Sequence, residues 1–202
     1  MTTALELIDL QIHLEYRLDS NGLLVPFPGS SEQGLYIAYR HAGGTVQYFN
    51  HCLPIELRTR LVELGASQAF EAPQVVERLI QEVTPARFEG QFVSEYIPRL
   101  PDPGGFPLVV TQQAQCVILV DGSPVCWAWS ERSNERCAEV AVETLPQHCR
   151  KGYARQVVAA WAYEVIGSGR TAFYSYKAEN EASRALARSL GAIWYADVVG
   201  FA

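Results

Sequence analysis

The chain lacks the features that mark membrane-spanning and nucleic-acid-binding proteins. No stretch approaches the roughly 20 consecutive apolar residues that a transmembrane helix needs. Its 16 Lys and Arg residues are outnumbered by 22 Asp and Glu residues, which gives a net charge of −6. Nucleic acids and anionic membranes both attract concentrated positive charge, so neither is expected as the main partner.

Metal motifs, disulfide frameworks and a secretory signal are also absent. The five cysteines form an odd set, and no two have the two-residue spacing of zinc knuckles or redox motifs. His13, His41 and His51 lack the helical spacing of metal ligands, so no metal site is expected. The N-terminus has no basic segment before an apolar core, so a reducing cytoplasm is the expected location.

What the chain does have begins with a mixed α+β region. Gly34 to Tyr39 and Thr45 to Phe49 are rich in aromatic and β-branched residues, and the Gly43-Gly44 pair between them predicts a hairpin. Apolar residues at helical spacing predict helices over Pro54 to Leu64 and Pro73 to Val83. This region contains no motif that indicates chemistry.

Two prolines and two glycines between residues 100 and 105 interrupt this pattern. Proline removes a backbone donor and glycine loosens the backbone, so neither a helix nor a central strand is expected there. The sequence therefore predicts an N-terminal hairpin-and-helix region of unknown role at residues 1–105 and a second domain at residues 106–202.

The second domain alternates strand and helix patterns. Cys116 to Val120 and Val125 to Trp129 flank a turn and predict a hairpin. The remaining expected elements are a strand at Ala138 to Thr144, a helix from about Lys151 to Gly167, a strand at Thr171 to Tyr176, a helix at Asn180 to Leu190, and two short strands at Ile193 to Tyr195 and Val198 to Phe201. Strand–helix–strand order implies a parallel pair, so the expected class is α/β with a mixed sheet.

The segment from Thr144 to Ala154 joins a strand to a helix. The first amides of a helix have no internal acceptor, and the helix dipole adds partial positive charge there. Arg150 and Lys151 add full charges, and Gly152 lets the backbone approach a ligand closely. These features predict a phosphate or pyrophosphate cradle. A basic, solvated helix start with one convenient glycine fits the same residues equally well.

The residues around this segment resemble motif A of the GNAT superfamily of N-acetyltransferases. Glu139 to Pro146, then Cys149 to Ala154, is similar to its strand and its Gln/Arg-x-x-Gly-x-Gly/Ala loop, with Cys149 at the first position. Asn180 to Arg184, closing at Leu190 to Ala192, is similar to the family's later pattern of Asn, a small residue, a helix and Gly. The order and separation of the two motifs match over about residues 116–202.

The resemblance implies a GNAT-like acyl-CoA-binding fold that transfers an acetyl group from acetyl-CoA, the co-substrate, to an amine. In that family the loop amides hold the pyrophosphate, and the preceding strand edge pairs with the pantetheine arm. The cofactor-binding residues that this implies are Val142, Glu143, Thr144, Arg150, Lys151, Gly152, Tyr153, Ala154, Arg155, Asn180 and Ser183. A plain N-cap explains Asn180 equally well.

Acetyl transfer needs a neutral amine, a stabilised oxyanion and an acid for the departing thiolate. Glu139 resembles the acidic residue that some family members use as a base through water, and Glu143 shares its strand face if pairing is regular. Contact with solvent, or with an arginine at a strand end, fits both carboxylates too. The family's usual tyrosine acid would fall at Ala187, which leaves Tyr174 or Tyr176, for which buried packing is the competing role.

Two other functions fit some of the same residues. Ala187 and Cys149 favour a catalytically degenerate GNAT-like module that binds acyl-CoA or regulates. Alternatively, Cys149 could be the nucleophile of a cysteine hydrolase, although the adjacent His148 rarely reaches the needed geometry. The sequence does not fix the acceptor, a small-molecule or peptide amine, or the oligomeric state.

Overall fold

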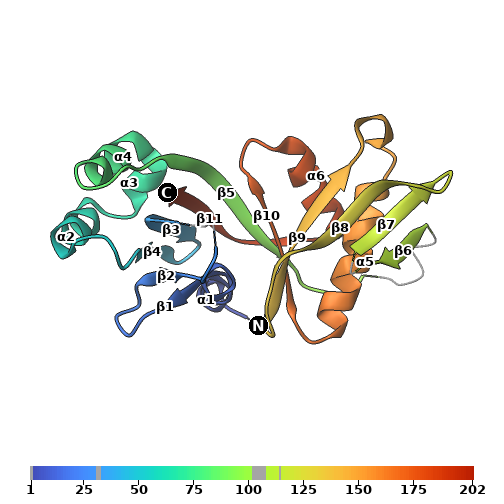
Figure 1. Ribbon diagram of the computed structural model, residues 1–202, viewed down its shortest axis with the longest axis horizontal. Coiled ribbons are helices and arrows are strands. Elements are labelled where there is room, and N and C mark those ends of the chain that lie inside the picture. The colour runs from blue at the N-terminus through green and yellow to red at the C-terminus, as the bar shows by residue number, and fades with distance from the viewer. Residues whose placement is uncertain (1, 31–32, 102–107, 114) are drawn as a thin grey trace. The chain divides into compact units, whose positions relative to one another are not determined.

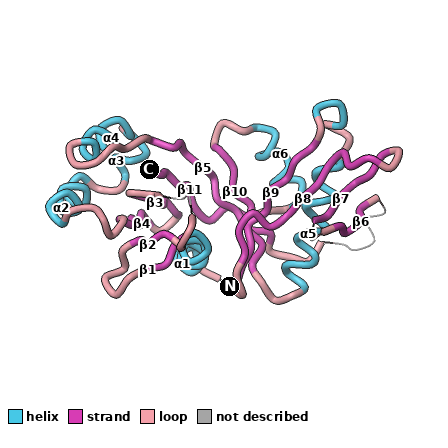
Figure 2. The backbone as a smooth tube through the Cα atoms, in the orientation of Figure 1, coloured by secondary structure: helices cyan, strands magenta, loops and turns pink. Residues whose placement is uncertain are grey.

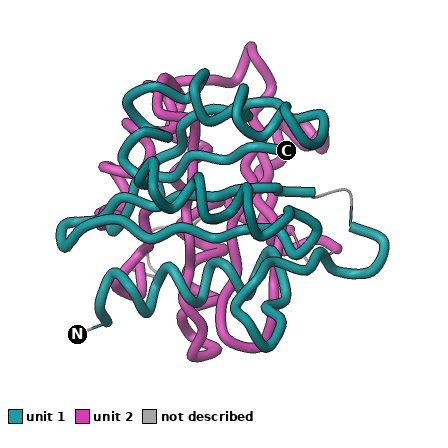
Figure 3. Tube along the Cα trace, turned by 90° about the vertical axis from the view of Figure 1, so that its left-hand side faces the viewer, with its two compact units in different colours: residues 1–94, 195–202 teal, residues 95–194 magenta. Residues whose placement is uncertain are grey.

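The computed structural model of the chain describes residues 2–30, 33–101, 108–113 and 115–202. They form two compact units, of which unit 1 is Met1–Ser94 with Tyr195–Ala202 and unit 2 is Glu95–Trp194 (Figure 3). The expected boundary between residues 105 and 106 falls within 102–107 and lies outside the described residues. The C-terminal segment belongs to unit 1, whereas the expected second domain continued to residue 202.

The helices of unit 1 are α1 (Ala4–Glu15), α2 (Ile55–Leu64), α3 (Ser67–Glu71) and α4 (Pro73–Gln81) (Figure 1). Helices α2 and α4 confirm the two predicted helices, and α1 was not predicted. A capping box starts α1, because Thr3 Oγ1 accepts the N–H of Glu6 at 3.2 Å and the Glu6 carboxylate accepts the N–H of Thr3 at 2.7 Å. Most of the apolar residues of α1 are buried, which stabilises the helix through packing.

Unit 1 contains a two-stranded ribbon and part of a larger sheet. The ribbon joins β1 (Tyr16–Leu18) to β2 (Leu24–Pro26). The larger sheet has the order β4-β3-β11-β5 here, formed by β3 (Tyr36–His41), β4 (Gly44–Phe49), β5 (Phe88–Ile97) and β11 (Ile193–Phe201). Residues 95–97 of β5 and 193–194 of β11 belong to unit 2. Strands β3 and β4 pair antiparallel and confirm the predicted hairpin.

The expectation of two short C-terminal strands was wrong, because β11 is continuous. Its central residue Asp197 pairs with Arg40 of β3, and the carboxylate lies 2.9 Å from the guanidinium. Ala196 beside it is fully buried. This pairing supports the strand through residues whose local pattern indicates a break. Leu57, Leu61 and Ile80 pack with the sheet residues in the core of unit 1.

Unit 2 contains β6 (Val109–Gln112), β7 (Gln115–Val120), β8 (Ser123–Ser133), β9 (Cys137–Thr144), β10 (Thr171–Lys177), α5 (Tyr153–Gly167) and α6 (Glu181–Leu190) (Figure 2). The strand order is β10-β9-β8-β7-β6. Strands β6 to β9 pair antiparallel in succession, and β10 pairs parallel to β9. The predicted hairpin, parallel pair and two helices of this half are confirmed.

Helix α5 packs on one face of the unit 2 sheet. Trp161 on this helix donates through Nε1 to Ser130 Oγ of β8 at 2.9 Å. The apolar side of α5, including Val157, Val158 and Val165, is buried. Helix α6 contacts α5 and β10. Among the described residues, no helix combines the length and the apolar character needed to cross a membrane.

Candidate active site

Strands β9 and β10 pair over only part of their lengths. Their last parallel pair joins Glu139 to Phe173. Beyond it β9 continues to Thr144 and β10 to Lys177, with no further pair between them among the described residues. The other edge of β9 stays paired with β8 as far as Thr144. The two strands therefore separate and leave backbone groups that an extended ligand could pair with.

The predicted strand contacts with the cofactor lie on this open edge. Val142, Glu143 and Thr144 all follow the last pair with β10. The Glu143 side chain is exposed, and Thr144 Oγ1 lies 3.1 Å from the sulfur of Cys126. Their backbone groups are thus placed where the resemblance put the pantetheine arm. Binding by these residues stays a prediction.

The loop after β9 holds a row of backbone donors. A short 3-10 helix, η2 (Pro146–His148), precedes it, and Arg150 (φ 62°) and Gly152 (φ 78°) are left-handed. Helix α5 then begins at Gly152 without a side-chain cap. In the described part of the chain, the N–H groups from Arg150 to Arg155 donate to no other group. Consecutive amides in such turns form anion-binding concavities.

Space and charge around these amides suit an anion. A Cβ built on Gly152 would meet no atom within 4 Å, so the space beside it is open. Arg150 and Lys151 are exposed, and the Lys151 ammonium lies 3.4 Å from His148 Nδ1. Arg155 is also exposed and donates through Nε to the carbonyl of Ser189 on α6 at 3.1 Å. The loop therefore concentrates positive charge beside unsatisfied donors.

The remaining loop residues belong to the first turn of α5. Tyr153 is half-buried, and its ring stacks on His148 with centroids 6.3 Å apart. Ala154 is also half-buried and is the second residue of the helix. The small Ala154 side chain leaves the amides of this turn uncovered.

Asn180 is the N-cap of α6 in this structure. Its Oδ1 accepts the N–H of Ser183 at 3.0 Å, which is one of the two roles the sequence left open. Within the described residues, Asn180 Nδ2 donates to no group, so it remains available to a ligand. Ser183 is half-buried, and its side chain acts to lower the pKa of the Tyr174 hydroxyl. Cofactor contact by Asn180 and Ser183 stays a prediction.

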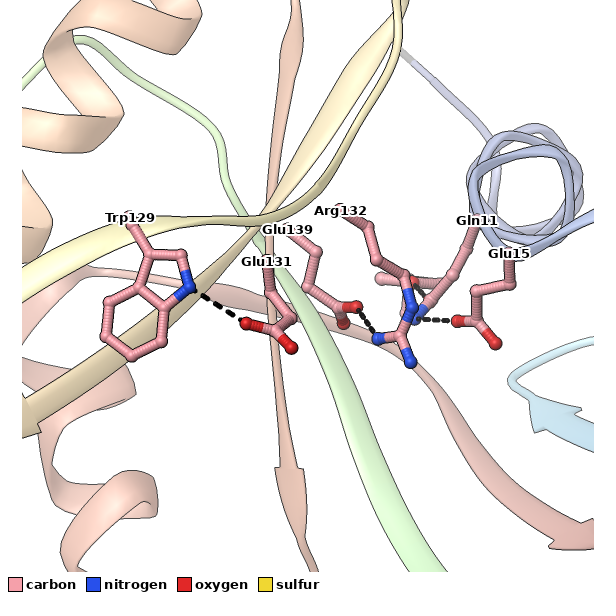
Figure 4. A network of polar contacts seen from close by, with 7 residues as sticks. Gln11, Glu15, Trp129, Glu131, Arg132 and Glu139 are labelled. Atoms are coloured by element: carbon pink, nitrogen blue, oxygen red, sulfur yellow. Dashed lines mark hydrogen bonds and ion pairs between the residues drawn. The ribbon is translucent and has the colours of Figure 1, made fainter. Parts of the chain in front are cut away.

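Glu139 is buried and ion-paired. Its Oε2 lies 2.9 Å from Arg132 Nη1 on β8 (Figure 4). The register shift beside this pair lies in β8 between Ser130 and Arg132, so β9 itself is regular. Glu143 therefore does share the strand face of Glu139. This ion pair matches the alternative role given for Glu139, contact with an arginine at a strand end. The role of Glu139 as a base stays a prediction.

Tyr174 lies on the opposite face of the sheet from Glu139. Phe173 is level with Glu139, and side chains alternate along a strand, so Tyr174 and Tyr176 point to the other face. Tyr174 is only 3% exposed, and burial raises the pKa of its hydroxyl. The three catalytic candidates Glu139, Glu143 and Tyr174 therefore do not share one face.

An acidic residue that no sequence pattern marks lies beside Tyr176. Glu95, near the end of β5, accepts a hydrogen bond through Oε1 from the Tyr176 hydroxyl at 3.2 Å. Burial raises the pKa of the Glu95 carboxyl, and its Oε2 is buried without a hydrogen-bond partner among the described residues. No motif marks Glu95, because its contact with Tyr176 joins residues 81 positions apart.

The arrangement expected of a cysteine hydrolase is not found at Cys149. Its thiol lies 3.6 Å from the carbonyl oxygen of Leu145. Nδ1 of His148 faces Lys151, and its ring stacks on Tyr153. Within the described residues, no hydrogen bond joins Cys149 to His148. A nucleophile and its base need that contact.

The chain is similar to one family model and to several solved structures. A family model described as FR47-like protein matches residues 124–198. A GCN5-related N-acetyltransferase-like protein from Streptococcus suis has a similar structure, with 15% identity and a TM-score of 0.51, over 87% of this chain and 86% of that chain. No curated protein matches the chain.

Two further solved structures are less similar. An acetyltransferase of the GNAT family from Colwellia psychrerythraea matches 100% of this chain and 97% of its own, with 9% identity and a TM-score of 0.48. YncA from Salmonella typhimurium, solved with its cofactor acetyl-CoA, matches 44% of this chain and 62% of its own, with 20% identity and a TM-score of 0.36. At these identities the Streptococcus suis structure shows a shared fold, which confirms the predicted α/β class with a mixed sheet.

Proposed function

We propose that the C-terminal half of this chain is a GNAT superfamily domain and that the protein is an acetyl-CoA-dependent N-acetyltransferase. The FR47-like match over residues 124–198 and the fold shared with the Streptococcus suis protein support this proposal. The acceptor in this proposal is a small-molecule or peptide amine. The acetyl group passes directly from the thioester to the amine nitrogen, with no covalent enzyme intermediate.

The proposal depends on one observation. Backbone N–H groups at the start of α5, without acceptors among the described residues, follow directly, along the chain, after the unpaired edge of β9. The N–H groups from Arg150 to Arg155 lack acceptors in the described part of the chain, and β9 has no partner on one side beyond Glu139. Coenzyme A has a diphosphate and an extended arm with two amides. A row of free N–H donors suits the diphosphate, and an unpaired strand edge suits the extended arm.

Different segments of the chain bind different parts of acetyl-CoA in this proposal. Arg150, Lys151 and the amides through Arg155 hold the diphosphate, and the backbone of Val142 to Thr144 pairs with the pantetheine arm. Asn180 Nδ2 supplies a further donor from the start of α6. Most of these contacts are backbone contacts. Cys149, at the position of the family's Gln or Arg, therefore costs little affinity.

The chemistry needs the amine as a free base, since an ammonium has no lone pair. Glu139 is the first candidate to accept the proton through water, with Glu143 on the same face. Tyr174, with its raised pKa, keeps its proton at neutral pH and is the candidate donor to the departing thiolate.

Isothermal titration calorimetry with acetyl-CoA and an amine screen together test the proposal. We expect acetyl-CoA to bind with a micromolar Kd and at least one primary amine to be acetylated, with free CoA released in equal amount. Binding without turnover across the screen would indicate the degenerate module. The absence of binding would contradict the proposal as a whole.

A further inference from the structure

Glu95 has a carboxylate oxygen that lacks a donor. Its Oε1 accepts the Tyr176 hydroxyl, whereas Oε2 is buried with no partner among the described residues. Leaving a buried acceptor unsatisfied is destabilising, and more so when the group is charged. A native fold keeps such an atom for a reason, and a ligand that brings a donor is one.

The charged groups that face Glu95 do not supply this donor. Arg184 and Arg188 on α6 act to lower the pKa of Glu95, but burial outweighs them and the pKa is raised. The Arg184 guanidinium donates instead to Glu181 Oε1 at 2.7 Å and to the carbonyl of Ala178. A cationic ligand would therefore meet Glu95 Oε2 free of any hydrogen bond from a described guanidinium group.

The Tyr176 hydroxyl connects this carboxyl to β10, one of the two strands that form the opening. Tyr176 lies on β10 beyond Phe173, the last residue that pairs with β9. Tyr174 lies two residues before Tyr176 on the same face, and their ring centroids are 5.8 Å apart. Tyr176 thus contacts the carboxyl, and Tyr174 lies next to Tyr176 on the strand beside the proposed path of the pantetheine arm. Glu95 itself is only half-buried, so rotation of its side chain would bring Oε2 to a ligand.

We propose that Glu95 binds the ammonium group of the acceptor and takes its proton, which makes the substrate class a primary amine that is cationic at neutral pH. This inference rests on the proposed function and changes one role in it. Glu95, on the sheet face of Tyr174 and Tyr176, takes the amine proton in place of Glu139, which stays paired with Arg132. Glu95 contacts the reacting nitrogen and is a catalytic residue, whereas Tyr176 is a positioning residue that acts through it.

The acetyl transfer balances in protons and electron pairs. One ammonium proton passes to Glu95 Oε2, which gives a neutral amine and a carboxylic acid. The nitrogen lone pair forms the N–C bond with the thioester carbonyl carbon, and the C–S bond breaks with the pair on sulfur. Tyr174 donates its hydroxyl proton to the thiolate and regains one from the nitrogen, so the products are the acetamide, CoA as its thiol, and the proton that Glu95 later releases to solvent.

The raised pKa of Glu95 suits this transfer. An alkyl amine with a pKa of about 10 is neutral in only about one molecule in 10³ at pH 7, so a fixed acceptor gives access to the abundant ammonium form. A carboxylate that burial makes more basic takes the proton at a lower cost than an ordinary surface carboxylate. The carboxylate must be ionised to act, so activity falls as pH drops through its pKa.

The test compares Glu95→Gln with Glu135→Gln in the full chain. Glu135 is exposed in the turn between β8 and β9 and has no side-chain partner among the described residues, so it is a matched control. The acceptors are 2-phenylethylamine, spermidine and the N-terminus of a short peptide. With the best of these, Glu95→Gln should lower kcat/KM by 10²- to 10³-fold at pH 7 and change the Kd for acetyl-CoA by less than twofold.

The pH profile separates proton transfer from a structural role. In the wild type, kcat/KM should be level between the pKa of Glu95 and that of the amine. In Glu95→Gln it should rise tenfold per pH unit over the same range, because only the free base then reacts. Tyr176→Phe removes a hydrogen bond that lowers the pKa of Glu95. In this variant, the fall of kcat/KM at low pH should therefore occur at higher pH than in the wild type.

Each result has one meaning. The wild type and Glu95→Gln could show parallel profiles of kcat/KM against pH while thermal unfolding curves show that both proteins are folded. That result would overturn the role of Glu95 and leave the acetyltransferase proposal standing. A wild type that binds acetyl-CoA but acetylates no amine would overturn both catalytic proposals. A wild type that does not bind acetyl-CoA would instead remove the proposed function at its first step.

Discussion

The two helices that follow strands in unit 2 begin in different ways. At α6, Asn180 accepts the N–H of Ser183 with its side chain and that of Arg184 with its carbonyl, both at 3.0 Å. At α5, Gly152 offers no side-chain cap, and the amides from Arg150 to Arg155 have no acceptor in the described part of the chain. A helix start that satisfies its own donors needs no anion, whereas one that leaves them exposed is ready for one.

The α5 start also contains more backbone strain. Arg150 adopts a left-handed φ of 62°, which costs a residue with a Cβ roughly 1–2 kcal/mol. The α6 start contains no residue with positive φ among 177–184. Strain of this kind persists where the surrounding structure or a ligand makes use of it. The chain therefore closes the start of α6 with its own side chain and leaves the start of α5 open.

The largest expected effect comes from placing a carboxylate at each start. Ala154→Glu and Ala182→Glu change the second residue of α5 and of α6, respectively. We expect Ala154→Glu to weaken acetyl-CoA binding at least 100-fold, because its charge competes with the diphosphate for the same amides. Ala182→Glu should change the Kd by less than twofold. Calorimetry measures both, and equal losses would remove the distinction between the helices.

The next effect concerns a thiol beside the open start. Cys149 and Cys52 are exposed, whereas burial raises the pKa of Cys116 to about 11 and also raises those of Cys126 and Cys137. Iodoacetamide should therefore modify the two exposed thiols first. Acetyl-CoA should slow modification of Cys149 about tenfold and leave Cys52 unchanged. Mass spectrometry of digested protein gives both rates, and unprotected Cys149 would place the ligand elsewhere.

A smaller effect is expected where alanine replaces a left-handed glycine. Gly152→Ala and Gly191→Ala both introduce a Cβ at positive φ into open space, at 78° and 68°. Each should lower the free energy of unfolding by about 1 kcal/mol. Gly152→Ala should also weaken acetyl-CoA binding about fivefold, because the new methyl group lies beside the ligand. Urea unfolding and calorimetry check both variants, and a similar loss of affinity in Gly191→Ala would indicate a general effect of stability.

The smallest effect belongs to the closed start. Asn180→Ala removes the side-chain acceptor for the N–H of Ser183 and should lower the free energy of unfolding by about 1 kcal/mol. Ser183→Ala keeps that hydrogen bond, since the donor is the backbone, and should cost less. Urea unfolding measures the difference. Asn180 Nδ2 is one cofactor donor among many in the proposed site, so acetyl-CoA binding should weaken only a few-fold. A loss of more than tenfold would contradict the leading role of the α5 start.

Local signals explain why so much of unit 2 could be predicted. Asn180 and Gly191 mark the ends of α6, and Gly152 with two cations marks the start of α5, through residue preferences that act over a few positions. The same signals do not show whether an N-cap also meets a ligand. Only the observed bond from Ser183 to Asn180 distinguishes the helix that caps itself from the one that does not.

The features that the sequence did not predict depend on contacts between distant residues. Asp197 pairs with Arg40 at a separation of 157 residues, and this contact lies in the middle of a strand that local patterns divide in two. Glu95 meets Tyr176 at a separation of 81 residues. Helix α1 has its apolar residues spread around most of its circumference, so its amphipathic signal is weak.

The free amides of α5 are best tested by amide NMR during titration with acetyl-CoA. We expect the backbone N–H signals of Arg150 to Arg155 to shift downfield together as they form hydrogen bonds, whereas those of Ser183 and Arg184 move little. The shifts should saturate at the calorimetric Kd. Saturable binding that leaves the signals from 150 to 155 unmoved would contradict a diphosphate at the start of α5.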